Sequence, residues 1–225
     1  MIDERLAEML APGGCPICHF RTDAEQRILE PLLGESVNDR TFRARLARGR
    51  GFCRWHVRQV VAADRRATGG ILGAAILFGA VMRQRRAELG GIESAGRRDV
   101  AKAAAEALRP ADCPVCEQLA PLVEGAASRL LGLTADVPWA EAVGAAEFCL
   151  EDLAWMSSRA AAAEGSFRSW TAVARAQQAR LAALQARVDG YVDHSSYDRA
   201  TELTTDEQAS IEEAARFLGG DRGSR

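Results

Sequence analysis

Residues 51–56 read Gly-Phe-Cys-Arg-Trp-His, and this stretch decides how the chain is expected to fold. Cys53 and His56 are three residues apart, so their side chains share one face of a helix. Upstream, "CPIC" at 15–18 places two thiols at the start of another expected helix, because proline suits the first helical position. The spacing therefore predicts that the helix carrying Cys53 and His56 packs against the CPIC turn.

This packing would bring together three thiolates and one imidazole, the donor set of a closed structural zinc site. Taken alone, Cys53 is more simply a small buried hydrophobic residue and His56 a hydrogen-bonded core histidine. The metal interpretation therefore depends on whether the pattern recurs along the chain. The first expected site consists of Cys15, Cys18, Cys53 and His56.

The pattern does recur, as "CPVC" at 113–116 and "FC" at 148–149. The offset between the two CPxC motifs, 98 residues, nearly equals the 96-residue offset between the two FC motifs. Two copies of one helical module are therefore expected. Asp152 takes the position of the histidine in the second copy, so either Asp152 ligates, His194 replaces it, or this site is metal-free. The second expected site consists of Cys113, Cys116, Cys149 and Asp152.

Helix-forming residues dominate the chain, and alternating strand patterns with hairpin turns are absent, which predicts an all-α helical bundle. We expect a first module at 1–96, a second at 97–164, and a long helix with a helical tail at 165–225, packed as one globular unit. Trp170, Gln177, Leu184 and Tyr191 recur at sevenfold spacing and predict a packing stripe. Helices are expected near 3–11, 16–33, 38–48, 53–66, 70–88, 97–108, 114–132, 138–146, 149–164, 166–193 and 205–218.

The composition fits a cytoplasmic protein with reduced thiols. Residues 2–11 do not resemble a secretory signal. Six cysteines without an export signal favour metal binding or redox chemistry over disulfides. The apolar stretch 70–82 is shorter than the roughly 18–20 residues that span a bilayer, so we expect a buried helix and no membrane span.

Other chemistries match the cysteines less well. "CPICH" at 15–19 resembles a haem-attachment motif, but that chemistry requires export. A thioredoxin-like dithiol belongs with a βαβ pattern, which the sequence lacks. An iron–sulfur cluster stays open, because iron and zinc share thiolate-rich sites.

Nine arginines lie between residues 38 and 66, against only two acidic residues. They indicate a solvated face, or a surface that docks either the acidic second half of the chain or an acidic partner protein. Nucleic-acid binding is less favoured, since no recognised reading motif accompanies the charge. The net charge of −2 gives no global attraction for anionic partners. The residues expected on this surface are Arg40, Arg43, Arg48, Arg54 and Arg58.

The chain resembles an uncharacterised prokaryotic domain-of-unknown-function family, numbered six thousand and sixty-two. The resemblance rests on the two CPxC motifs, the segment 37–56, the small-residue stretch beginning at 69, and the tail at 193–220. It implies the module architecture and a tail of the type His-x-x-Tyr-x-Arg, approximated by His194, Tyr197 and Arg199. It also implies a histidine where Asp152 stands, and it leaves the activity open.

No catalytic set emerges from the sequence: it has no Ser/His/Asp spacing and no phosphate-binding glycine loop. We therefore expect a non-enzymatic, zinc-stabilised binding or accessory protein that associates with another protein. The alternatives are an iron–sulfur or dithiol redox protein or subunit of an electron-transfer complex, and a nucleic-acid-binding zinc protein.

Overall fold

The structure, a computed structural model, describes residues 8–10, 13–163, 165–195 and 203–220. Within these ranges it contains ten α-helices, one 3-10 helix (η1) and no strand, which confirms the all-α prediction. The helices are α2 (Pro16–Gly34), η1 (Ser36–Asn38), α3 (Arg40–Arg48), α4 (Arg54–Thr68), α5 (Leu72–Ser94), α6 (Val100–Ala107), α7 (Pro114–Leu133), α8 (Val137–Ala145), α9 (Leu150–Ala162), α10 (Ser166–His194) and α11 (Thr205–Gly219).

Most helices begin and end close to the positions expected from the sequence. The main difference is α5, which continues to Ser94 through Gly90 and Gly91, where a break was expected. Glycine lowers helix stability but does not forbid a helix, and the Ser94 hydroxyl donates a hydrogen bond to the Gly90 carbonyl. The helix expected near 3–11 lies mostly outside the described residues.

The chain divides into two compact units. Unit 1 combines the chain up to Thr22 with the chain from Val123 onward, and unit 2 comprises Asp23–Leu122. These limits differ from the expected module boundaries at 96 and 164. The difference arises because α2 and α7 each contribute their two ends to different units. Unit 2 is therefore a continuous central stretch, and unit 1 joins the two stretches that flank it.

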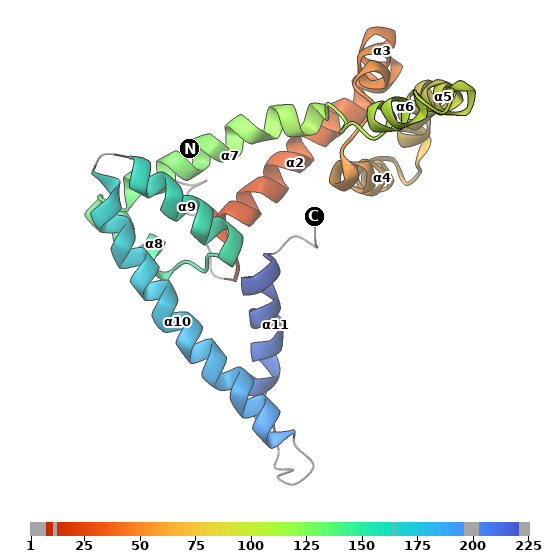
Figure 1. The fold of residues 1–225 in the computed structure, drawn as a ribbon. Coiled ribbons are helices and arrows are strands. Elements are labelled where there is room, and N and C mark those ends of the chain that lie inside the picture. Colours follow the sequence, from red (N-terminus) through yellow and green to blue (C-terminus); the bar gives the residue numbers. More distant parts are fainter. Residues whose placement is uncertain (1–7, 11–12, 164, 196–202, 221–225) are drawn as a thin grey trace. The chain divides into compact units, whose positions relative to one another are not determined.

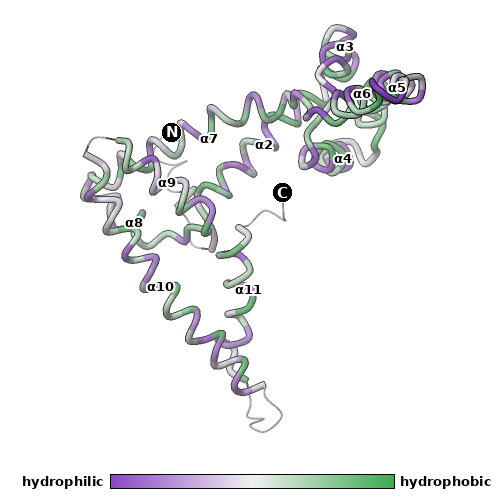
Figure 2. The backbone as a smooth tube through the Cα atoms, in the orientation of Figure 1, coloured by the Kyte–Doolittle hydropathy of each residue, from purple (hydrophilic) through white to green (hydrophobic). Residues whose placement is uncertain are grey.

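Unit 1 is built around α10, which packs against α8, α9 and α11. Figure 1 shows α10 and α11 as neighbouring helices, and α11 also contacts α9. Hydrophobic and hydrophilic residues alternate along α10 in Figure 2, as an amphipathic helix requires. Trp170, Gln177 and Leu184 of the expected stripe are buried, whereas Tyr191 is only half-buried.

Unit 2 is built around α5, which contacts α3, α4 and α6. Leu77 is fully buried, while Leu72 and Met82 are exposed, so the apolar stretch 70–82 is buried on one face only. Across the described parts of the chain, no helix combines the length and apolar character needed to cross a membrane.

The turn before Cys53 is fixed tightly within unit 2. Gly51 has φ of 91°, and a Cβ atom there would lie 2.9 Å from Val81. The adjacent Arg50 also has positive φ, and its buried guanidinium pairs with Glu88 and Glu106. Arg50 is one of the nine arginines of the basic segment, but it is buried in these ion pairs and does not belong to an exposed surface.

Candidate metal centres

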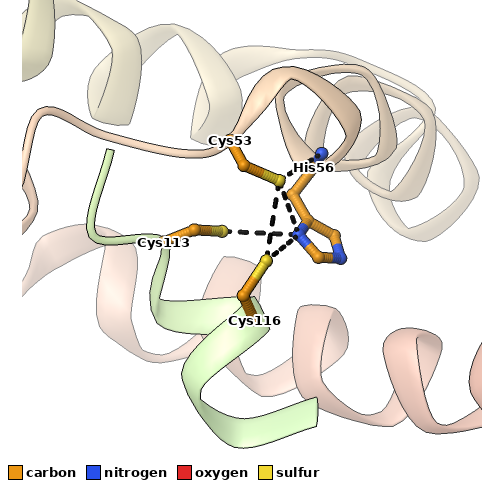
Figure 3. Close-up of side chains that lie close together, drawn as sticks. All are labelled: Cys53, His56, Cys113 and Cys116. Atoms are coloured by element: carbon orange, nitrogen blue, oxygen red, sulfur yellow. Dashed lines mark hydrogen bonds between the residues drawn. The ribbon is translucent and has the colours of Figure 1, made fainter. Parts of the chain in front are cut away.

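Four metal-donor side chains converge in unit 2. We call this group cluster A; it consists of Cys53, His56, Cys113 and Cys116, and Figure 3 shows all four side chains pointing toward one another. The His56 Nδ1 atom lies 3.2 Å from the Cys53 sulfur, 3.4 Å from Cys113 and 3.3 Å from Cys116. The Cys53 and Cys116 sulfurs are 3.6 Å apart. A Cys₃His donor set is therefore present.

These separations suit a single ion at the centre of the cluster. Zinc–donor bonds of about 2.0–2.3 Å and tetrahedral angles place neighbouring donor atoms about 3.5–3.8 Å apart. The donors of cluster A are close to that spacing, and all lie within 4.8 Å of one another. The cluster could therefore hold a metal ion with only small movements of its side chains.

The local helix start explains how Cys53 and His56 meet. Cys53 is the N-cap of α4, with φ −65° and ψ 167°, and its sulfur accepts a hydrogen bond from the His56 backbone N–H. An N-cap side chain turns back over the first helical turn, so it faces the residue three positions later. Phe52 is buried and packs edge-on against Phe78, which fixes the chain just before the cap.

The imidazole of His56 is held from its far side by Glu25 of α2. Nε2 of His56 lies 2.9 Å from Oε1 of Glu25, and the indole N–H of Trp55 donates to the same oxygen at 3.1 Å. Glu25 is only 4% exposed. With Nε2 donating to this buried carboxylate, Nδ1 is the ring nitrogen left to face the sulfurs. This is the usual orienting arrangement for a metal-bound histidine.

A second group of donors converges in unit 1. We call it cluster B; it consists of Cys15, Cys18, Cys149 and Asp152, all buried. Oδ2 of Asp152 lies 3.3 Å from the Cys15 sulfur, 3.2 Å from Cys18 and 3.3 Å from Cys149. The Cys18 and Cys149 sulfurs are 3.9 Å apart. The carboxylate oxygen thus takes the place that the imidazole nitrogen takes in cluster A.

Cluster B repeats the local geometry of cluster A. Cys149 is the N-cap of α9, with φ −71° and ψ 160°, and Asp152 again lies three residues later. Phe148 packs edge-on against Trp170. The backbone around Phe148 is further fixed by Gln177 of α10, whose amide accepts from the Phe148 N–H and donates to the Ala146 carbonyl. Gln177, the polar residue in the buried stripe of α10, therefore positions the turn that precedes Cys149.

The partner of Asp152 has the opposite charge to the partner of His56. The guanidinium of Arg21, on α2, donates to Oδ1 of Asp152 at 3.0 Å, and both side chains are almost fully buried. A carboxylate adds one negative charge to a three-thiol site, and Arg21 offsets that charge. The two clusters therefore differ both in their fourth donor, His56 or Asp152, and in the residue that supports it, Glu25 or Arg21.

The C-terminal end of α11 lies directly on cluster B. Gly220 follows α11 with φ of 71°, and its N–H bonds to the Arg216 carbonyl. A Cβ atom at Gly220 would lie 3.0 Å from the Cys18 sulfur and 3.5 Å from the Cys149 sulfur. Glycine is therefore required here by the backbone conformation and by the space beside the sulfurs.

The expected grouping of the donors is wrong, although all eight residues lie in clusters. Cys53 and His56 meet Cys113 and Cys116, while Cys149 and Asp152 meet Cys15 and Cys18. Each helix that starts with FC is paired with the CPxC turn of the other module. His194, the suggested replacement ligand, belongs to neither group and lies 2.9 Å from Glu207. Tyr197 and Arg199 lie outside the described residues.

The sequence pattern of the family described as "Family of unknown function (DUF6062)" matches residues 6–224, a range that includes both clusters. The chain belongs to the DUF6062 family. No curated protein and no solved structure matches the chain.

In this DUF6062 chain burial and the contacts among His56 and the cysteines together shift the pKa values of cluster A. Burial raises the pKa of the Cys113 thiol, but the hydrogen bond with His56 contributes to lowering that pKa to about 6. Burial lowers the pKa of His56, while the Cys113 and Cys53 sulfurs raise it overall. Burial and the charge of Cys113 raise the pKa of Cys116. The lowered pKa of Cys113 favours one thiolate in cluster A, and ionisation of the further thiols requires a compensating cation.

In cluster B the donors oppose one another's ionisation. Hydrogen bonds with Cys149 and Cys18, followed by burial, raise the pKa of Cys15. For Cys149, the hydrogen bond with Cys15 lowers the pKa, but Cys18 and burial outweigh it and raise the pKa to about 12. Burial raises the pKa of Asp152 despite the opposing charge of Arg21. A bound divalent cation would stabilise the ionised donors and so offset these raised pKa values.

Arg21, Glu25 and Gly220 support the clusters but were not identified from the sequence. No motif marks them, because each acts through a contact made by tertiary packing. Of the arginines expected on a surface, Arg43 is half-buried and donates to the Val37 carbonyl. The exposed members of that set are Arg40, Arg48, Arg54 and Arg58.

Proposed function

We propose that this protein is a non-enzymatic binding or accessory protein whose two units are each stabilised by one zinc ion. The observation that carries the proposal is the equivalence of His56 Nδ1 and Asp152 Oδ2, each 3.2–3.4 Å from three sulfurs. Four protein donors complete a tetrahedral shell and leave no position for a substrate, as is typical of structural zinc sites.

The geometry favours one ion per cluster over an iron–sulfur cluster. Donors that all lie within 4.8 Å of one another surround a single ion, and several irons bridged by sulfide need more space. Thiolate-rich sets with one imidazole or carboxylate suit zinc. Six free cysteines require a reducing compartment to stay available for metal, which supports a cytoplasmic location.

Elemental analysis of the purified chain tests the proposal. We expect two zinc ions per chain, one in each of the His56→Ala and Asp152→Ala variants, and none in the double variant. Structural zinc contributes on the order of 10 kcal/mol to folding in small modules, so a chelator should lower the melting temperature strongly. A brown protein containing iron and acid-labile sulfide, or unchanged melting with chelator, would contradict the proposal.

We further infer that the partner is an acidic protein surface bound by the exposed arginines of α3 and α4. Arg54 and Arg58 lie on the exposed side of the helix that carries His56. Capture experiments with the zinc-loaded chain should recover an acidic protein, and Arg54→Glu with Arg58→Glu should abolish its binding. Recovery of nucleic acid with steep salt dependence would contradict this inference.

A further inference from the structure

The two clusters differ in how exposed their cysteine residues are. In cluster A, Cys116 is exposed and Cys53 is partly exposed. In cluster B the three cysteines are only 2–4% exposed. Oxidation of a thiolate requires that an oxidant molecule reach the sulfur atom. Only cluster A contains a cysteine residue that is exposed to solvent.

Within cluster A, the sulfur of the exposed residue Cys116 also has a close partner. Cys53 and Cys116 come from the starts of two different helices, α4 and α7, and their sulfurs are 3.6 Å apart. Figure 3 shows the two side chains pointing toward each other. A disulfide bond is about 2.05 Å long, so a short approach of the two side chains would form it. Cys113, by contrast, is buried.

We propose that Cys116 is an oxidation site for hydroperoxides, that Cys53 resolves the oxidised sulfur, and that the resulting disulfide releases the metal of cluster A alone. This inference rests on the proposed function, because a bound ion must be present to be released. It adds a reversible response to oxidants to a site that otherwise only stabilises the fold.

The chemistry balances with a hydroperoxide as the only oxidant. The Cys116 thiolate attacks the outer peroxide oxygen, the O–O bond breaks, and the alcohol or water leaves with a proton from solvent. The Cys53 thiolate then attacks the Cys116 sulfenic sulfur, forming the S–S bond and expelling hydroxide, which takes a second proton. Two thiolates lose two electrons and the hydroperoxide gains them.

Loss of two thiolates leaves the ion with only Cys113 and His56 from the original four donors. Two donors hold zinc far more weakly than four, so the ion dissociates. The disulfide then joins the starts of α4 and α7 in place of the metal. A thiol reductant reverses the step and allows the ion to bind again.

The test uses the full-length zinc-loaded chain, hydrogen peroxide and a chromogenic chelator. We expect one of two zinc ions to be released, a Cys53–Cys116 disulfide by peptide mass spectrometry, and unmodified Cys15, Cys18 and Cys149. Reductant with added zinc should restore two ions. The Cys18→Ser variant is the matched control and should release its cluster A ion at the unchanged rate.

A second variant tests which sulfur of cluster A is oxidised first. In Cys53→Ser the proposed resolving thiol is absent, so dimedone should label Cys116. Release of both ions at one rate, a Cys113–Cys116 disulfide, or labelling of Cys113 would overturn the inference. A chain that holds zinc but keeps both ions under peroxide contradicts this inference alone, whereas a chain without zinc before peroxide contradicts the proposed function as well.

Discussion

The Glu25 carboxylate lies 2.9 Å from Nε2 of His56 and is buried with it, so a residue of α2 orients the imidazole that faces three sulfurs. The same oxygen accepts the indole N–H of Trp55. Glu25 therefore contacts two neighbouring residues of α4, Trp55 and His56, and supports cluster A through them.

Removing this support should weaken metal binding at cluster A. Loss of a carboxylate that orients a metal-bound histidine typically costs about 10–100-fold in metal affinity. We expect that loss for Glu25→Ala and a smaller one for Glu25→Gln, whose amide oxygen can still accept from His56. Competition titration with a chelator of known affinity measures both, and cluster B should keep its affinity.

Asp152 and Arg21 make the corresponding prediction for cluster B. Asp152→Asn removes the negative charge and leaves the buried guanidinium of Arg21 without its counter-charge. Breaking a buried ion pair costs roughly 3–5 kcal/mol, so metal-free Asp152→Asn should unfold at lower denaturant concentration than the metal-free parent. Chemical denaturation of both proteins checks this, and an unchanged midpoint would contradict the role given to the pair.

Gly220 gives a prediction about the end of α11. In Gly220→Val the new side chain would collide with the Cys18 sulfur and strain a backbone with φ of 71°. We expect zinc at cluster B to exchange at least about tenfold faster, because the helix end can no longer lie on the sulfurs. Gly219→Val, where a Cβ meets nothing within 4 Å, is the control and should exchange at the parental rate.

The raised pKa values in cluster B predict a strong pH dependence of metal binding. The pKa of Cys149 is about 12 and that of Cys15 is also raised, so both thiols are protonated at neutral pH without metal. A bound ion displaces these protons, so affinity rises with pH, by roughly tenfold per pH unit for each proton released. Calorimetry in two buffers measures how many protons are released when a metal ion binds. For the His56→Ala variant, which retains cluster B alone, we expect more than one proton per ion. A count of zero would contradict this prediction.

Much of the fold could be predicted from the sequence because its signals are local. Proline at the first position of α2 and α7, and the glycine turn before Phe52, mark helix ends through backbone geometry alone. The approach of Cys53 to His56, and of Cys149 to Asp152, follows from three-residue spacing on a helix. α5 nevertheless continues through Gly90, so a glycine in the sequence does not by itself mark the end of a helix.

By itself, the sequence determined the helices, the two sets of three cysteines, and the positions of His56 and Asp152 one helical turn after a thiol. Only the tertiary structure decided which CPxC turn meets which of these helices, and that Glu25, Arg21 and Gly220 support the result. The physical reason is that the two CPxC turns offer the same donors. Either pairing yields one Cys₃His and one Cys₃Asp set, so the choice depends on long-range packing between distant segments.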